Sequence, residues 1–194
     1  MSVIFGIKEK NQIIVAGDKR ASNINGEFIS DEMQKVIAIN DCLCMASAGS
    51  MAIEKAILKE VEASGNKNNL LAEDLIDIAG SFYAKVVENQ CDSIYNLPFY
   101  CLIAGKGRDG KGHLYNAGRF KAGFDYKEVP MALYPPADAK ADCNQIFVKN
   151  YKIHHKDFCK RTVVEISEIS NIVSPVGNEW VYDIVSGKGR LSEF

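Results

Sequence analysis

The sequence predicts an α+β fold, a four-layer α/β/β/α sandwich of two antiparallel sheets flanked by helices. Two observations lead to this prediction. Strand-like pairs occur near the start, the middle and the end of the chain, and helical stretches separate them in the order β-β, α-α, β-β, α, β-β. The 194 residues contain no linker, low-complexity tract or tandem repeat, so we expect residues 1–194 to form a single domain.

The N-terminal region reads as two hairpins. Apolar and β-branched residues dominate Val3–Lys8 and Gln12–Ala16, and the polar stretch Glu9-Lys10-Asn11 lies between them. After a polar connection the same signal returns in Lys35–Asn40 and Leu43–Ala46. Two hairpins therefore precede the first helix.

A helical period begins after Ser50. Ile53, Ile57 and Val61 recur every four residues until a Ser-Gly-Asn stretch stops the pattern. A second helix is expected over residues 71–90, because its apolar residues fall on one side. The two helices predict one outer layer of the sandwich.

The remaining chain supplies the other strands and the second helical layer. Residues 141–169 have a helical composition. The strands expected around this segment are Phe99–Ala104, His113–Asn116, Val129–Tyr134, Asn171–Ser174 and Trp180–Val185, the last two as a hairpin around Pro175-Val176-Gly177-Asn178.

Charge and hydropathy exclude two classes of partner. The net charge is −2 and acidic and basic residues interleave, so the basic patch that nucleic-acid binding needs is not expected. The N-terminal apolar stretch is too short for a signal peptide, and no later stretch approaches the length of a membrane span. We therefore expect a cytoplasmic protein that binds neither nucleic acid nor membranes.

The cysteines and histidines do not predict a metal site. The six cysteines lie mostly in apolar runs and are expected to be free thiols, and Cys42 and Cys44 have no matching second pair. His154, His155 and Cys159 lie close together, with His155 and Cys159 one helical turn apart, but their charged neighbours favour a solvated helix face. No metal is expected.

A glycine-rich stretch, residues 105–110, matches the GxGxxG pattern of dinucleotide-binding sites. The segment HLYNAG that follows reads as a strand, so the helix N-terminus that would bind pyrophosphate is missing. We interpret the stretch as a hairpin turn and expect no cofactor.

Three short segments carry a family resemblance. IIVAGDKRAS (residues 13–22), QKVIAIN (34–40) and MASAGS (45–50) resemble, in order and spacing, the three signature blocks of proteasome β subunits, with one extra residue in the loop 23–32. The resemblance implies a proteasome-like N-terminal-nucleophile (Ntn) hydrolase, which cleaves a peptide or another amide. It also implies a homo-oligomer, which could be a ring because subunits of this family assemble into rings.

The resemblance assigns four residues to the catalytic site. Ser2 would be the nucleophile once Met1 is removed, and its own α-amine, with an ordinary pKa of about 7.7–8.0, would be the base. Lys35 would lower the pKa of that amine, and Asp18 would hold the Lys35 ammonium in place. The backbone N–H of Gly49 would bind the oxyanion.

By position in the family, four more residues would form the walls of the pocket beside the nucleophile, namely Ala21, Met33, Ser47 and Met51. Because these are small or apolar and no acid or base is expected in the wall, the resemblance predicts an uncharged, hydrophobic substrate side chain. Packing in the core is the alternative role for the same residues.

Two family elements have no clear counterpart. A Gly-Ser-Gly stretch is replaced by MALYPPADAK, and the nearest match to a later Asp-x-x-Ser element is Ser167–Ser170, which keeps only the serine. Two hypotheses therefore stay open. The chain is an active hydrolase with different residues supporting the amine, or it is a non-catalytic assembly or interaction protein on the same scaffold.

Overall fold

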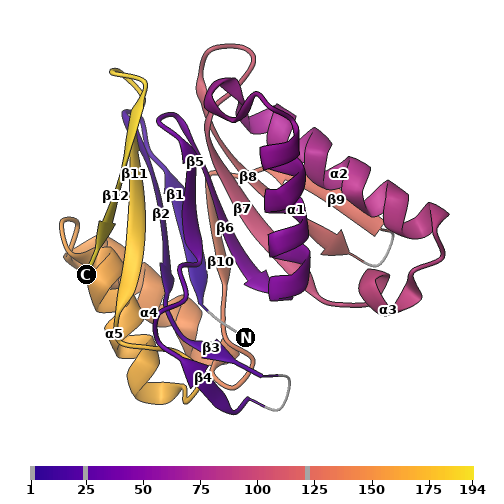
Figure 1. Cartoon of the computed structure of the whole chain (residues 1–194). Coiled ribbons are helices and arrows are strands. Elements are labelled where there is room, and N and C mark those ends of the chain that lie inside the picture. The colour runs from indigo at the N-terminus through magenta and orange to yellow at the C-terminus, as the bar shows by residue number, and fades with distance from the viewer. Residues whose placement is uncertain (1–2, 24–25, 121–122) are drawn as a thin grey trace.

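In the computed structural model, which describes residues 3–23, 26–120 and 123–194, two five-stranded antiparallel sheets pack face to face with helices outside (Figure 1). The strand orders are β10-β1-β2-β11-β12 in the first sheet and β5-β6-β7-β8-β9 in the second. This arrangement confirms the predicted α/β/β/α sandwich.

The first sheet joins the two ends of the chain, because β2 lies between β1 and β11. Helices α4 and α5 cover its outer face (Figure 1). Its elements are β1 (Ile4–Lys8), β2 (Gln12–Asp18), β10 (Met131–Tyr134), β11 (Gly177–Asp183), β12 (Lys188–Glu193), α4 (Lys140–Ile153) and α5 (Phe158–Ile169).

The second sheet comes from the middle of the chain and is covered by α1 and α2. Its strands are β5 (Val36–Asn40), β6 (Leu43–Gly49), β7 (Phe99–Lys106), β8 (Gly112–Phe120) and β9 (Gly123–Glu128). The helices on this side are α1 (Met51–Ala63), η1 (Lys67–Asn69), α2 (Ala72–Glu88) and α3 (Asp92–Tyr95). The short strands β3 (Ala21–Ser22) and β4 (Phe28–Ser30) form a separate hairpin.

Three apolar clusters correspond to the three interfaces between layers. One joins α1 and α2 to the second sheet, another joins α4 and α5 to the first sheet, and the third lies between the sheets. The third cluster contains Ile4 and Trp180 from the first sheet and Leu102 and Leu114 from the second, all almost fully buried. Burial on both faces explains the nearly continuous apolar runs of β2 and β6.

The last part of the chain differs from the sequence prediction. Asn171–Ser174 is not a strand, and the final hairpin pairs β11 with β12, one strand later than expected. The segment Pro175–Asn178 is therefore not the hairpin turn but leads into β11. Strands β9 and β12 were not predicted, because their polar residues have no apolar alternation and their strand conformation comes from pairing with β8 and β11.

Three smaller predictions can be compared with the structure. Gly107–Lys111 forms the turn between β7 and β8, as expected, with a Gly107 N–H to Lys111 carbonyl bond of 2.8 Å. All six cysteines are free thiols. The expectation that His155 and Cys159 share a solvated helix face is wrong. Helix α5 begins at Phe158, so His155 precedes it, and Cys159 is buried within it.

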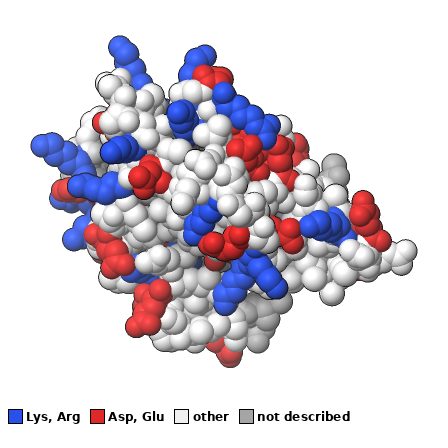
Figure 2. Space-filling model, turned by 45° about the horizontal axis from the view of Figure 1, so that its top comes forward, with Lys and Arg blue, Asp and Glu red and all other residues white. Residues whose placement is uncertain are grey.

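Figure 2 shows one face of the molecule, on which lysine and arginine side chains lie among aspartate and glutamate side chains. Within the described part of the chain, no helix is long and apolar enough to cross a membrane.

Candidate active site

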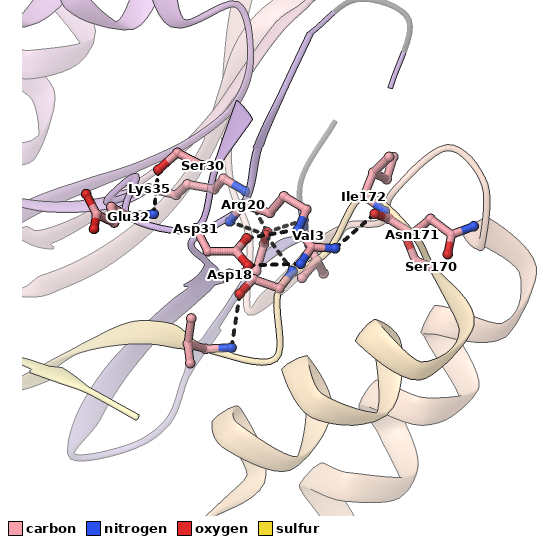
Figure 3. Close-up of polar contacts among 12 residues, drawn as sticks. Val3, Asp18, Arg20, Ser30, Asp31, Glu32, Lys35, Ser170, Asn171 and Ile172 are labelled. Carbon is pink, nitrogen blue, oxygen red and sulfur yellow. Dashed lines mark hydrogen bonds and ion pairs between the residues drawn. The ribbon is translucent and has the colours of Figure 1, made fainter. Parts of the chain in front are cut away.

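Asp18 is the centre of a buried polar cluster at the end of β2 (Figure 3). Its side chain has no solvent exposure. Oδ1 accepts hydrogen bonds from Lys35 Nζ (2.7 Å) and from the backbone N–H of Val3 (3.0 Å). Oδ2 accepts from the backbone N–H groups of Arg20 (2.8 Å) and Ser174 (3.2 Å). Four donors thus compensate for the removal of this carboxylate from water.

Lys35 lies directly before β5, so its ion pair with Asp18 connects the two sheets. The side chain is only 4% exposed. Burial lowers the pKa of Lys35, and the charge of Asp18 and its hydrogen bond only partly offset this effect. The structure therefore brings together the predicted Asp18 and Lys35 as a buried pair.

Val3 connects this cluster to the N-terminus. Its N–H donates to Asp18, and its carbonyl accepts a hydrogen bond from the Asp18 N–H at 3.2 Å. The predicted nucleophile Ser2 and the preceding Met1 lie outside the described residues. The structure thus fixes the residue after Ser2, and the position of Ser2 stays a prediction.

Arg20 holds the loop that follows β2. Its guanidinium makes two bonds of 2.9 Å to the carboxylate of Asp31 and one of 3.0 Å to the carbonyl of Asn171 (Figure 3). The Arg20 hydrogen bond lowers the pKa of Asp31, despite an opposing effect of burial. Arg20 thus joins the segments that surround Asp18.

Gly49 ends β6 at the edge of the same site. Its φ of +112° lies in the region that side chains disfavour, and a Cβ would come within 2.2 Å of the Pro98 carbonyl oxygen. Glycine is therefore required here by the backbone itself. The predicted role of the Gly49 N–H in binding an oxyanion stays a prediction.

A pocket opens beside the ion pair. All four predicted wall residues line it, together with Lys35 and Gly49. Its lining is Arg20, Ala21, Ser22, Met33, Lys35, Ser47, Gly49, Met51 and Glu54. The expectation that no acid or base lines this pocket is wrong, because three of these side chains carry ionisable groups.

Glu54 is the residue that the sequence prediction missed. It lies in the first turn of α1, is 4% exposed, and accepts a short hydrogen bond from the Ser47 hydroxyl. Burial raises the pKa of Glu54, while the Ser47 hydrogen bond and the charge of Lys35 lower it to a smaller extent. A glutamate among helical residues is usually solvated, so only the packing of α1 against β6 reveals its position.

The structure also changes the assignment of the late serine. Ser170, the nearest match in the sequence, binds Asp138 through its hydroxyl at 2.8 Å. Ser174 is the serine that reaches the site, since it is fully buried and its N–H contacts Asp18. Its place just before β11, the partner strand of β2, brings it to Asp18, and no signal in the sequence gives this pairing.

Comparisons with known proteins identify the family of the chain. Residues 2–118, more than half of the chain, match the family model described as "Proteasome subunit". The chain is similar to proteasome subunit beta 2 of Sulfolobus acidocaldarius, with 29% identity over 112 residues. That alignment covers 57% of this chain and 53% of the archaeal subunit, so the chain matches about half the length of its relative. The chain belongs to the proteasome subunit family.

Proposed function

We propose that the protein is an Ntn amide hydrolase, a peptidase, that uses Ser2 as its nucleophile after Met1 is removed. The observation that carries this proposal is that Asp18 binds both Lys35 Nζ and the Val3 N–H through one oxygen. Consecutive Cα atoms are about 3.8 Å apart, so a residue bonded to Val3 is within reach of the Lys35 ammonium. The Lys35 charge is thus held near Val3, the residue that follows the proposed nucleophile.

This arrangement suits a mechanism in which the chain's own amine is the base. The Lys35 charge favours the neutral form of the Ser2 α-amine, which accepts the hydroxyl proton as Ser2 Oγ attacks the amide carbon. The oxyanion of the tetrahedral intermediate would bind the N–H of Gly49. The protonated α-amine of Ser2 then gives its proton to the leaving nitrogen, the C–N bond breaks, and the acyl group stays on Ser2 Oγ as an ester. Water, deprotonated by the amine, then hydrolyses that ester.

A second candidate function is a non-catalytic assembly or interaction protein. The family match ends at residue 118, and the segment that contains Pro135 and Pro136 forms β10 and its connection to α4. In this hypothesis the buried Asp18–Lys35 pair only fixes the packing of the two sheets.

Subunits of the proteasome family assemble into rings, and under either hypothesis we propose a cytoplasmic homo-oligomer.

Intact-mass measurement and covalent labelling separate the two functions. We expect the mature protein to lack Met1 and a serine-directed electrophile, such as a peptide epoxyketone, to add one equivalent to the wild type and none to Ser2→Ala. A retained Met1 in the native protein would exclude the terminal amine as base. Equal labelling of the wild type and of Ser2→Ala would move the nucleophile elsewhere.

A further inference from the structure

Asp31 follows β4 and reaches the residues around Asp18 (Figure 3). Its carboxylate accepts two hydrogen bonds of 2.9 Å, one on each oxygen, from Nε and Nη2 of Arg20. Such a two-point contact fixes both the position and the plane of a guanidinium. The side chain of Asp31 is 34% exposed. Asp31 therefore places a negative charge between the buried cluster and solvent.

Ser174 is the second residue that Asp31 holds. The Ser174 hydroxyl accepts a hydrogen bond from the Val176 N–H at 3.3 Å and donates its own proton to Asp31. Arg20 and Ser174 are also the residues whose backbone N–H groups donate to Asp18 Oδ2, at 2.8 and 3.2 Å. Asp31 therefore binds the side chains of both residues that position this oxygen.

The charge of Asp31 also acts on Lys35. Burial lowers the pKa of Lys35, and the charge and hydrogen bond of Asp18 are the largest effects that oppose it. The charges of Asp31 and then of Glu54 oppose it further. Arg20 lines the same pocket as Lys35, and its own charge is matched by Asp31. Loss of the Asp31 charge would therefore leave Lys35 with less compensation and with an unpaired guanidinium in the same pocket.

We propose that Asp31 is a positioning residue of the proposed hydrolysis. It holds the two backbone donors of Asp18 in place, and its negative charge stabilises the ammonium of Lys35. The inference rests on the proposed function for the statement that these groups serve a reaction. Asp31 acts on the reacting atoms only through other residues, so it is not a catalytic residue.

The titration of Lys35 tests this role without requiring hydrolysis. Asp31→Asn keeps the size of the side chain and removes its charge, whereas Asp31→Glu keeps the charge. Glu32→Gln is the matched control, because it removes one negative charge from the exposed neighbouring residue. The pH at which Lys35 loses its proton is measured by carbon-13 NMR of the protein labelled at the lysine ε-carbons, with Lys35→Arg to assign the signal.

We expect Asp31→Asn to move the titration of Lys35 to lower pH, because the ammonium loses a compensating charge and Arg20 loses its partner. Asp31→Glu and Glu32→Gln should titrate close to wild type. An unchanged titration in folded Asp31→Asn would overturn the inference, and so would an equal shift in Glu32→Gln. Asp31→Ala removes the same charge and gives the same comparison if the asparagine variant does not fold.

The pH dependence of labelling by the peptide epoxyketone then reports on the reaction separately. The acid limb of the labelling rate follows the Ser2 amine, which must be neutral to act as base. With one negative charge fewer nearby, this amine loses its proton at lower pH. The rate on the acid limb, relative to each protein's own plateau, should therefore be about threefold higher in Asp31→Asn than in wild type.

Two outcomes of the labelling experiment have different meanings. A loss of rate in Asp31→Asn that is equal at every pH would overturn the role of Asp31 in the reaction. A wild-type protein that is not labelled would reject the proposed hydrolase, and the titration of Lys35 would then decide alone on the effect of Asp31.

Discussion

Asp18 combines several interactions that would each be costly alone. Its carboxylate is fully buried and is matched by one ammonium and three backbone N–H groups. A buried ion pair adds little net stability compared with an apolar pair, but removing one partner leaves an unpaired charge. Asp18 therefore contributes mainly by positioning, since it holds Val3, Lys35 and Ser174 in fixed places relative to one another.

Gly49 gives a prediction at the same scale. Gly49→Ala should destabilise the protein by about 2–3 kcal/mol or more, because the alanine needs a positive φ and its Cβ overlaps the Pro98 carbonyl. Gly65 is a matched control, since its φ is +67° and a Cβ there meets nothing within 4 Å. Gly65→Ala should cost only about 1 kcal/mol. Urea unfolding of the two variants measures the difference, and equal losses would show that the Pro98 contact relaxes.

At the scale of elements, ion pairs and hydrogen bonds between charged side chains connect the β7–β8 hairpin to α2 and β9. Arg108 in its turn bonds Asp74 and Asp77 of α2, and His113 on β8 bonds Asp109 and Glu128 at 2.8 and 3.0 Å. The Arg108 pairs are partly or largely exposed and the partners of His113 are also exposed, so each pair is worth little alone. Together they hold the turn that the GxGxxG pattern had marked.

The pH dependence of His113 provides the second prediction. Burial opposes its charge, but the hydrogen bonds to Asp109 and Glu128 outweigh burial and raise the pKa of His113 in the folded state. The charged His113 therefore stabilises the folded protein fully below the pKa of histidine in the unfolded chain, about 6.5. This stabilisation is lost as the pH rises through the pKa of His113 in the folded protein.

His113→Gln should accordingly cost more stability at pH 5.5 than at pH 8.5, by up to about 1 kcal/mol after allowance for solvent screening. Urea unfolding at both pH values, with the exposed His155→Gln as control, gives the comparison. A cost for His113→Gln that grows with pH would contradict the assignment of the charged pairs.

The strands show which elements a sequence can predict. β1, β2, β6 and β7 were predicted because both of their faces are buried, which requires runs of apolar residues. β12 is an edge strand of polar composition, KGRLSE, and only the backbone of β11 gives it strand structure. Local sequence carries no signal for such pairing.

At the scale of the whole molecule, Trp180 reports on the packing of the two sheets. It is the only tryptophan, is 1% exposed in the cluster between the sheets, and stacks on Tyr182 with 5.5 Å between ring centroids. If residues 1–194 form one domain, as the sequence predicts, separation of the sheets and loss of secondary structure should occur together. Urea transitions followed by tryptophan fluorescence and by far-UV circular dichroism should then share a midpoint within about 0.2 M. Two resolved midpoints would mean that the layers unfold separately.

The candidate site was only partly predictable for a physical reason. Asp18, Lys35 and Gly49 belong to short segments whose residues and spacing resemble a known family, so their convergence could be expected before the structure. Glu54 and Ser174 reach the site through packing of α1 on β6 and of β11 on β2. The first is a contact between a helix and a sheet and the second is a strand pairing within one sheet, and neither propensity nor local spacing encodes them.

The position of β11 beside β2 has a consequence for biosynthesis. A growing chain makes Val3, Asp18 and Lys35 early, but the strand that completes their sheet begins only at Gly177. Until residues 177–194 have left the ribosome, one edge of β2 has no partner strand, and its apolar residues are open to pairing with other chains. A product terminated before β11 would therefore be an aggregation hazard, and the site would form only in chains that contain β11.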